Sequence, residues 1–346
     1  MKPICIKGRE EVAETPTESA VGRRLRKRFE QLASGVASAH VLRDYGIFLF
    51  GLVLFIALSI GAPHFLTVSN LVETLREVSI TGIGAVGMAI VIITGGIDVS
   101  VGSVLVFGSI AAALPLRAGW PLALCIPLGF FSGLLVGWIN GILITRVGIS
   151  PIITTLGTMT IVSGASFLIT GGMTVFQIPQ AISFLGRGFL GPLPFPVILL
   201  FAVYILAYFY LEWTVSGRYI FAVGGNEEAT RLSGINTRRI KVIAYVICGG
   251  TAAVAGLIIL GRLVAAELSG GSSYPFDVIT AVALGGVSLS GGKGNIWKVL
   301  LGAVILGMLA DGFVLLDVQE YWRMVMTGVV LLLAVASDIA MEKTRI

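Results

Sequence analysis

The sequence of 346 residues is too apolar for a water-soluble protein. Hydrophobic residues make up 56% of the chain and charged residues 12%, with a mean hydropathy of +0.95. Soluble domains carry about 25% charged residues, so this chain cannot cover its surface with polar groups. The composition predicts an all-α integral membrane protein, because the apolar runs are continuous and lack the period of two that is typical of a transmembrane β-barrel.

The first 44 residues form a polar tail that is too long and too polar for a cleaved signal peptide. The net charge of +5 and the basic cluster at 23–28 raise the question of nucleic-acid binding. We interpret the cluster as the cytoplasmic flank of a first membrane span and expect no nucleic-acid partner. The three cysteines, Cys5, Cys125 and Cys248, show no paired spacing, which gives a disulfide framework no support.

About ten transmembrane helices are predicted, because ten apolar segments follow the tail. They span 45–62, 72–93, 99–115, 121–145, 151–170, 194–213, 242–262, 276–290, 296–315 and 323–340. The second begins with Glu73, Arg76 and Glu77, so its apolar core starts near Val78. The eighth is short, Gly-rich and opened by Pro275, which indicates a broken or re-entrant element.

The lysines and arginines predict that both termini lie in the cytoplasm. With ten spans, nineteen basic residues fall on the side of the tail and five on the other side, as the positive-inside rule requires. The predicted organisation is a cytoplasmic tail (1–44), a transmembrane domain (45–340) and a short cytoplasmic C-terminus (341–346). Two connections are long. The outer one, about 171–193, forms either an irregular ledge or a floppy connector, and the inner one, 214–241, has the densest charge outside the tail.

Two short segments resemble each other, 95–102 (GGIDVSVG) and 285–292 (GGVSLSGG). Both follow an apolar stretch, as the broken elements of inverted repeats do in transporters. Glycine is also common in membrane helices, so an inverted internal repeat and a chance similarity of two turns remain as alternatives.

No catalytic, metal or cofactor site is predicted. The two histidines, His40 and His64, lie outside the apolar segments, and the sequence has no HExxH motif, Cys/His cluster or Gly-x-Ser-x-Gly elbow. Lys293 does not complete a phosphate-binding loop, because Gly286 is one residue too far away and Gly294 stands where Ser or Thr would bind magnesium. We therefore expect no nucleotide hydrolysis by this chain.

Carboxylates near membrane spans are functional candidates, because burying a charge in lipid is costly. Asp98, Glu267 and Asp277 lie close enough to predicted span ends to be solvated. Asp311 lies about two-thirds along its segment and should face protein or water. For Asp311 we favour helix packing or cavity lining over a proton relay.

Four stretches together resemble the permease subunits of bacterial ABC importers for monosaccharides, the branch that transports ribose, xylose, galactose and autoinducer-2. They are 79–103 (ending ITGGIDVSVGS), 140–159 (beginning NGILITRVGISP), 217–235 (GRYIFAVGGNEEATRLSGI) and 281–295 (AVALGGVSLSGGKGN). The similarity runs in order through 65–338. The chain departs from the pattern in its long tail and at Asp311-Gly312 and Leu316-Asp317, where such permeases often carry Asn-Gly and Leu-Gly. These differences leave the transported sugar open.

The resemblance implies a permease subunit that forms the translocation path for a monosaccharide or similar polyol-like solute, and not an enzyme. It also implies cytoplasmic ATPase subunits, an extracytoplasmic sugar-binding protein, and a second copy of this chain or a similar permease, in the lipid bilayer of a bacterial inner membrane. By the same resemblance, the loop 224–235 docks on the ATPase. Its candidate coupling residues are Gly224, Gly225, Asn226, Glu227, Glu228, Ala229, Leu232, Gly234 and Ile235.

The residues of this loop suit docking on physical grounds. Its glycines allow a sharp turn, Asn226 can cap the following helix, and two glutamates fall in the first turn, where the helix dipole favours them. Ala229, Leu232 and Ile235 recur at helical spacing and offer an apolar stripe to a partner groove. A solvated amphipathic loop lying on the lipid headgroups is the alternative.

Polar side chains within the apolar segments are candidates for weak contacts to sugar hydroxyls, since tight binding in a pore would slow release. Ser and Thr also join membrane helices to one another, so packing is the alternative role. The candidates are Thr94, Asp98, Ser100, Ser103, Asn140, Thr154, Thr155 and Asp311.

Two other classes of protein remain as alternatives. An ion-coupled secondary carrier would need a coupling-ion site and no partner loop. A membrane-embedded enzyme would need a catalytic constellation, which this sequence lacks.

Overall fold

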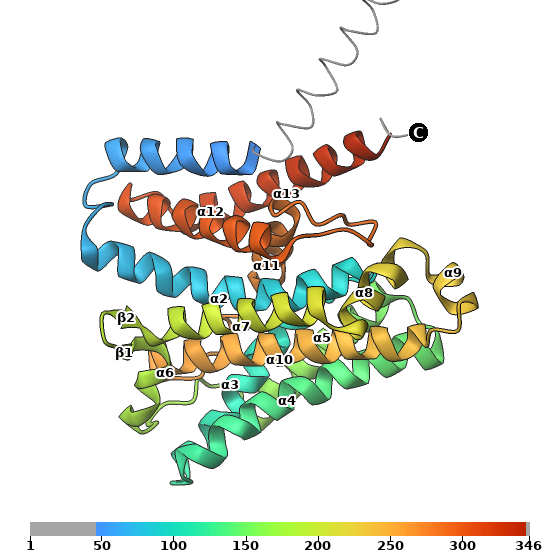
Figure 1. Ribbon diagram of the computed structural model, residues 1–346. Coiled ribbons are helices and arrows are strands. Elements are labelled where there is room, and N and C mark those ends of the chain that lie inside the picture. Colours follow the sequence, from blue (N-terminus) through green and yellow to red (C-terminus); the bar gives the residue numbers. More distant parts are fainter. Residues whose placement is uncertain (1–45, 344–346) are drawn as a thin grey trace, which may run out of the picture. The chain divides into compact units, whose positions relative to one another are not determined.

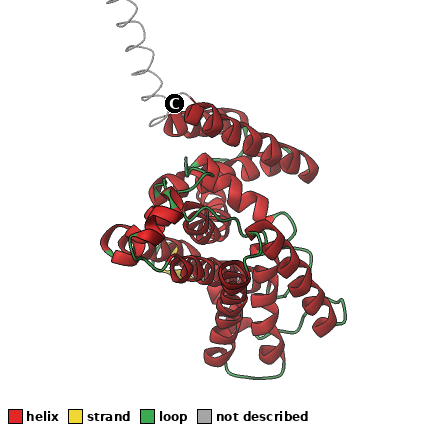
Figure 2. Ribbon diagram, turned by 90° about the vertical axis from the view of Figure 1, so that its right-hand side faces the viewer, coloured by secondary structure: helices red, strands yellow, loops and turns green. Residues whose placement is uncertain are grey.

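The computed structural model describes residues 46–343, except for the side chains of residue 320 and of residues 337–343. The predicted tail, 1–44, and the last three residues lie outside this range. Most of the described chain is helical (Figures 1 and 2). The predicted all-α class of membrane protein is therefore confirmed.

Each of the ten predicted apolar segments coincides with one apolar helix in the described range. They are the helix Gly46–Gly61, α2 (Val68–Ile93), α3 (Val101–Arg117), α4 (Leu122–Ile142), α5 (Pro151–Thr170), α7 (Phe195–Trp213), α10 (Thr237–Leu263), α11 (Tyr274–Leu284), α12 (Ile296–Leu315) and α13 (Glu320–Lys343). Six of these, α2, α4 with the π-helical turn η1 (Leu143–Val147), α5, α7, α10 and α12, are long and apolar enough to cross a membrane.

Helix α2 lies at the centre of the described bundle. It packs against α7, α10, α11 and α12, and 89% of its apolar window is buried within the protein. Peripheral helices differ, because α4, α5 and α7 expose large apolar side chains such as Leu135, Ile161 and Leu206. Such faces suit contact with lipid rather than water.

Close helix packing is concentrated between α4 and α10. A Cβ atom on Gly133 would meet the backbone of Gly249, and one on Gly137 would meet the backbone carbonyl of Tyr245. Small residues four apart let two membrane helices approach backbone to backbone, where van der Waals contacts take the place of a hydrophobic driving force.

The predicted outer loop is an ordered ledge and not a floppy connector. It contains η2 (Gln180–Ile182), α6 (Ser183–Arg187) and a hairpin of β1 (Phe189–Leu190) and β2 (Leu193–Pro194). The Arg187 Nε donates to the Arg262 carbonyl at 2.6 Å, and Val175 pairs with Ala266 in an isolated β-bridge. These contacts fix the ledge to the end of α10.

The eighth apolar segment is interrupted, as its glycines and Pro275 indicate. Helix α11 has 11 residues, which at about 1.5 Å each is too short to cross a hydrocarbon core of about 30 Å. Gly286 follows with a φ of 69°, and the chain stays non-helical until Asn295 caps α12 by accepting from the backbone of Trp297 at 2.9 Å. The rest of this segment is thus irregular backbone, which is half-buried or exposed over 288–292.

The expectation that Asp98 is solvated is wrong. The turn that joins α2 to α3 stays inside the bundle, and Asp98 is 1% exposed. The sequence places Asp98 just after an apolar run, but the run's end does not coincide with the protein surface. Glu267 is exposed, and the Asp277 side chain retains 15% exposure.

Candidate functional site

The predicted coupling loop folds into two helices that meet at Asn226. Helix α8 covers Val215–Gly225 and α9 covers Glu227–Leu232. Asn226 leaves the helical conformation, and its side-chain oxygen accepts from the backbone N–H of Ala229 at 2.9 Å. Glu227 and Glu228 occupy the first turn of α9. The predicted cap and the predicted position of both glutamates are confirmed.

Helix α9 is held in place by contacts to both of its neighbours. The Thr230 hydroxyl donates to the Ala222 carbonyl of α8 at 2.9 Å. Lys241 of α10 pairs with Glu227 at 2.5 Å. The six residues of α9 are therefore a fixed projection and not a flexible loop, although so short a helix would be unstable alone.

The exposed surface of α9 differs in part from the predicted stripe. Ala229 is exposed and Leu232 has 73% of its surface exposed. The helix ends at Leu232, and Gly234 reverses the chain with a φ of 83°. Ile235 therefore lies beyond the helix and is half-buried, so Ala229 and Leu232 alone form the apolar face of α9.

The end of α8 lies where the two similar Gly-rich segments, 95–102 and 285–292, come together, against the last residue of α2 and the second segment. A Cβ atom on Gly224 would meet the backbone carbonyl of Ile93 and the backbone nitrogen of Gly292. Those two groups are hydrogen-bonded to each other at 2.8 Å. We call this meeting of three backbones the glycine junction. The sequence indicates each turn separately but gives no sign that Gly224 lies where they come together.

Four of the polar residues in the central helices form one buried chain of hydrogen bonds. Ser100 donates to the Asp98 carboxylate through its backbone N–H at 2.9 Å and its hydroxyl at 2.5 Å. Asn140 of α4 donates to the Ser100 hydroxyl at 2.9 Å, and the hydroxyl of Thr158 of α5 donates to the Asn140 amide oxygen at 2.6 Å. Thr158 is the member that the sequence reasoning missed.

The other predicted path residues lie around this chain or away from it. The Thr94 and Ser103 hydroxyls donate to backbone carbonyls within their own turns, and the Thr155 hydroxyl donates to the Pro151 carbonyl at 3.0 Å. The Thr154 hydroxyl is buried without a hydrogen-bond partner among the described residues. Asp311 stands apart, where it accepts from Asn70 of α2 at 2.7 Å.

A cluster of ion pairs lies next to the ledge, and Figure 1 shows the ledge, with α6, β1 and β2, at the end of the bundle opposite α9. Glu73 of α2 pairs with Arg76 of the same helix and with Arg262 of α10, and Glu77 pairs with Arg262. The Arg76 guanidinium also donates to the Arg187 carbonyl at 2.9 Å. The sequence indicates this site only through charged residues at the start of an apolar segment. It does not indicate their partners, which lie in distant parts of the chain.

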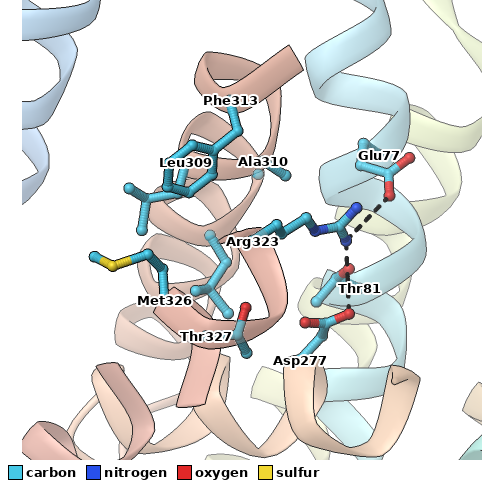
Figure 3. Close-up of a pocket in the computed structure, with 11 residues that line it drawn as sticks. Glu77, Thr81, Asp277, Leu309, Ala310, Phe313, Arg323, Met326 and Thr327 are labelled. Carbon is cyan, nitrogen blue, oxygen red and sulfur yellow. Dashed lines mark ion pairs between the residues drawn. The ribbon is translucent and has the colours of Figure 1, made fainter. Parts of the chain in front are cut away.

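Arg323 of α13 extends this cluster across a hollow in the surface. Its guanidinium lies 3.6 Å from the Asp277 carboxylate of α11 and 4.0 Å from that of Glu77, and Figure 3 shows it pointing between the two. Adjoining cavities of about 310 Å³ and 300 Å³ are both lined by Asp277 and Arg323. We call these two spaces together the outer cavity.

Comparison with known proteins assigns the chain to a family. The family model described as "Branched-chain amino acid transport system / permease component" matches residues 70–335. The chain is 38% identical over 291 residues to the ribose import permease protein RbsC of Haemophilus influenzae, which covers 83% of this chain and 90% of that protein. It is 40% identical over 314 residues to RbsC of Bacillus subtilis, covering 89% and 98%.

A third relative is the L-arabinose transport system permease protein AraH of Escherichia coli, 34% identical over 312 residues, which cover 90% of this chain and 95% of AraH. No solved structure matches the chain. The chain belongs to this family of transport-system permease components. It is a multi-pass protein of the bacterial inner membrane and a transport component rather than an enzyme. The resemblance drawn from the four sequence stretches is confirmed.

Proposed function

We propose that this chain forms the translocation path of an ATP-driven importer for a monosaccharide. Relatives over most of its length are named for the import of ribose and the transport of L-arabinose, two neutral sugars. In this proposal the chain crosses the membrane ten times with both termini in the cytoplasm. It pairs with a second copy or a similar permease, and an extracytoplasmic binding protein delivers the sugar.

The observation that carries the ATP-driven mechanism is the fixed projection of α9. A coupling element must transmit force, and α9 is tied to α8 through Thr230 and to α10 through Lys241. It exposes Leu232, an apolar anchor of the kind that inserts into a partner's groove. Its neighbour Gly224 contacts the last residue of α2 and the turn that follows α11. Movement of a docked ATPase would thus reach the end of α2 and this turn directly.

The buried chain from Asp98 to Thr158 holds α3, α4 and α5 together around the first turn. In the proposed cycle these helices tilt as the path changes its open side, and the polar groups then become available for weak contacts to sugar hydroxyls. Weak contacts suit a path, because binding must permit release.

The test measures ATP-dependent ribose uptake and ATPase recovery together. The tagged chain is expressed with its ATPase and binding protein, purified, and reconstituted in proteoliposomes. We expect co-purification of the ATPase and uptake that stops when ATP is withheld. Uptake that continues without ATP and stops when an ion gradient is collapsed would show an ion-coupled carrier instead.

Leu232→Ala isolates the docking step. Truncating an anchor at the centre of an interface costs about 2 kcal/mol or more, so recovery of the ATPase should fall by about tenfold or more. Val147→Ala is the matched control, because Val147 is similarly exposed, at 63%, but lies on η1. Equal recovery for both variants contradicts docking on α9.

A further inference from the structure

The outer cavity is lined by hydroxyl-bearing residues as well as by ion pairs. Besides Asp277 and Arg323, its walls include Glu77 and Arg262, together with the hydroxyl-bearing residues Thr81 and Ser273. Each of its two parts has a volume of about 300 Å³, at the lower end of the range for small-molecule sites. The cavity is therefore large enough for a small solute.

The charges of the cavity walls cancel. Two carboxylates, Glu77 and Asp277, face two guanidiniums, Arg262 and Arg323. A cavity with one sign of charge concentrates ions of the opposite sign. Because positive and negative groups are equal in number here, the cavity should not favour either anions or cations. Carboxylates only accept hydrogen bonds and guanidiniums only donate them, whereas a hydroxyl can do both. A neutral molecule with several hydroxyls matches this alternation of acceptors and donors.

Part of the remaining wall is apolar. Ile259 and Leu263 of α10 lie on one side, and Phe276, which is 56% exposed, lies on the other. A mostly apolar cavity with a few convergent polar groups is the usual form of a small-molecule site. A sugar ring has the same division, with hydroxyls on its rim and C–H groups on its faces.

We propose that the outer cavity binds the hydroxyl groups of a monosaccharide at the entrance of the translocation path. This inference rests on the proposed function and adds the place where the permease first contacts the sugar. Asp277 and Arg323 are its central contacts, because both line each part of the cavity and lie on different helices, α11 and α13. The site is weak, with a Kd on the order of 1 mM, since a tight site would retain the sugar.

Protection of an introduced thiol tests the site directly. Ser273 is exposed and lines both parts of the cavity. The Ser273→Cys chain, with Cys5 replaced by serine, is purified with its ATPase in lipid nanodiscs and labelled with a maleimide. Cys125 and Cys248 are buried, which keeps the background low. Ribose or L-arabinose at roughly tenfold excess over Kd should slow labelling about tenfold, because the fraction of empty sites falls by that factor.

Matched variants decide whether protection comes from the cavity. Ala181→Cys is exposed on the ledge and lines neither part of the cavity, so its labelling should not respond to sugar. Adding Asp277→Asn to Ser273→Cys should remove the protection, whereas adding Glu267→Gln, an exposed carboxylate outside the cavity, should leave it. Ribose 5-phosphate should protect no better than ribose, because the cavity charges cancel.

The outcomes separate this inference from the proposed function. Failure of both sugars to protect Ser273→Cys, or equal protection of Ala181→Cys, overturns the site even where the same preparation takes up ribose with ATP. Protection that survives Asp277→Asn also overturns the assigned contacts. If the chain without substitutions shows no ATP-dependent uptake, the proposed function is rejected, whatever the labelling shows.

Discussion

The two Gly-rich turns of the bundle share a sequence pattern but are held in different ways. The turn after α2 reverses at Gly95 with a φ of 81°, and the turn after α11 reverses at Gly286 with a φ of 69°. In the first turn, Asp98 and Ser100 are buried and bonded to α4 through Asn140. The glycines thus set the backbone, and the side chains decide how firmly each turn is fixed.

The second turn is more open. Its residues 288–292 are half-buried or exposed, and it is closed by a backbone hydrogen bond from Ser288 to Lys293 at 3.1 Å. It touches the first turn at the glycine junction, where Gly224 of α8 also lies. The comparison shows that the first turn is buried inside the bundle, whereas the second turn reaches the surface beside α8.

The largest expected effect comes from filling the glycine junction. In Gly224→Ala the new methyl group would meet the backbone of Ile93 and of Gly292, and neither can rotate away. Overpacking of this kind costs about 1–3 kcal/mol, so ATP-dependent ribose uptake should fall by about tenfold or more. Gly225→Ala is the control, because its methyl group would meet open space. Equal uptake by the two variants would falsify a role for the junction in coupling.

Removing the Thr158 hydroxyl, which supports the first turn through Asn140, should have the next largest effect. In Thr158→Val the buried amide oxygen of Asn140 loses its donor at 2.6 Å, which costs about 1–3 kcal/mol. Thermal unfolding in detergent measures this loss. Thr160→Val on the same helix is the matched control, because Thr160 is exposed and its hydroxyl donates to the Leu156 carbonyl of its own helix. The control should change stability by less than about 0.5 kcal/mol.

The two turns have similar backbones, so replacing the glycine at which each chain reverses should destabilise the protein equally. This effect should be smaller than that of Thr158→Val. Gly95→Ala and Gly286→Ala each place a methyl group in open space but in the left-handed region, at a cost of about 1–2 kcal/mol. Gly292→Ala should cost more, because its methyl group would also meet the backbone of Gly225. Thermal unfolding of the three variants side by side checks this order, and a lower cost at Gly292 contradicts it.

The smallest effect is expected from the surface ion pair of α9. Arg231 donates to Glu228, and this hydrogen bond lowers the pKa of Glu228 below its ordinary value of 4.5. A lowered carboxyl pKa gives stability that is present above that ordinary value and lost as the pH falls through the folded value. Recovery of the ATPase should therefore stay constant from about pH 8 to about pH 6, and Glu228→Gln should change it little, since exposed pairs contribute little.

The sequence predicts the helices well because membrane helices depend on local properties. Continuous apolar runs identify each segment, Pro275 and its neighbouring glycines indicate the short α11, and Asn226 before two glutamates predicts the start of α9. Chain reversal at Gly234 was not anticipated, and it removes Ile235 from the helix. Gly234 stands just before the last residue of the predicted stripe, and a single glycine is only weak evidence that a helix ends.

The sites depend on long-range contacts, which one sequence does not record. Asp98 lies at the end of an apolar run, where a water-exposed position is the natural expectation, but the helices that cover it come much later in the chain. The outer cavity joins Glu77, Asp277 and Arg323 from three helices. The sequence shows that each of these charged residues lies unusually close to an apolar segment. Only the fold shows that they lie together.

The burial of α2 has a consequence for how the protein is made. Helices enter the membrane in the order of synthesis, so α2 is present before α7, α10 and α12, the helices that later surround it. Until they arrive, Glu73 and Glu77 lack their distant partner Arg262, and charges at this position weaken the retention of a lone helix in lipid. The nascent chain therefore passes through a stage in which α2, the centre of the finished bundle, is held less firmly in the membrane than its later neighbours will be.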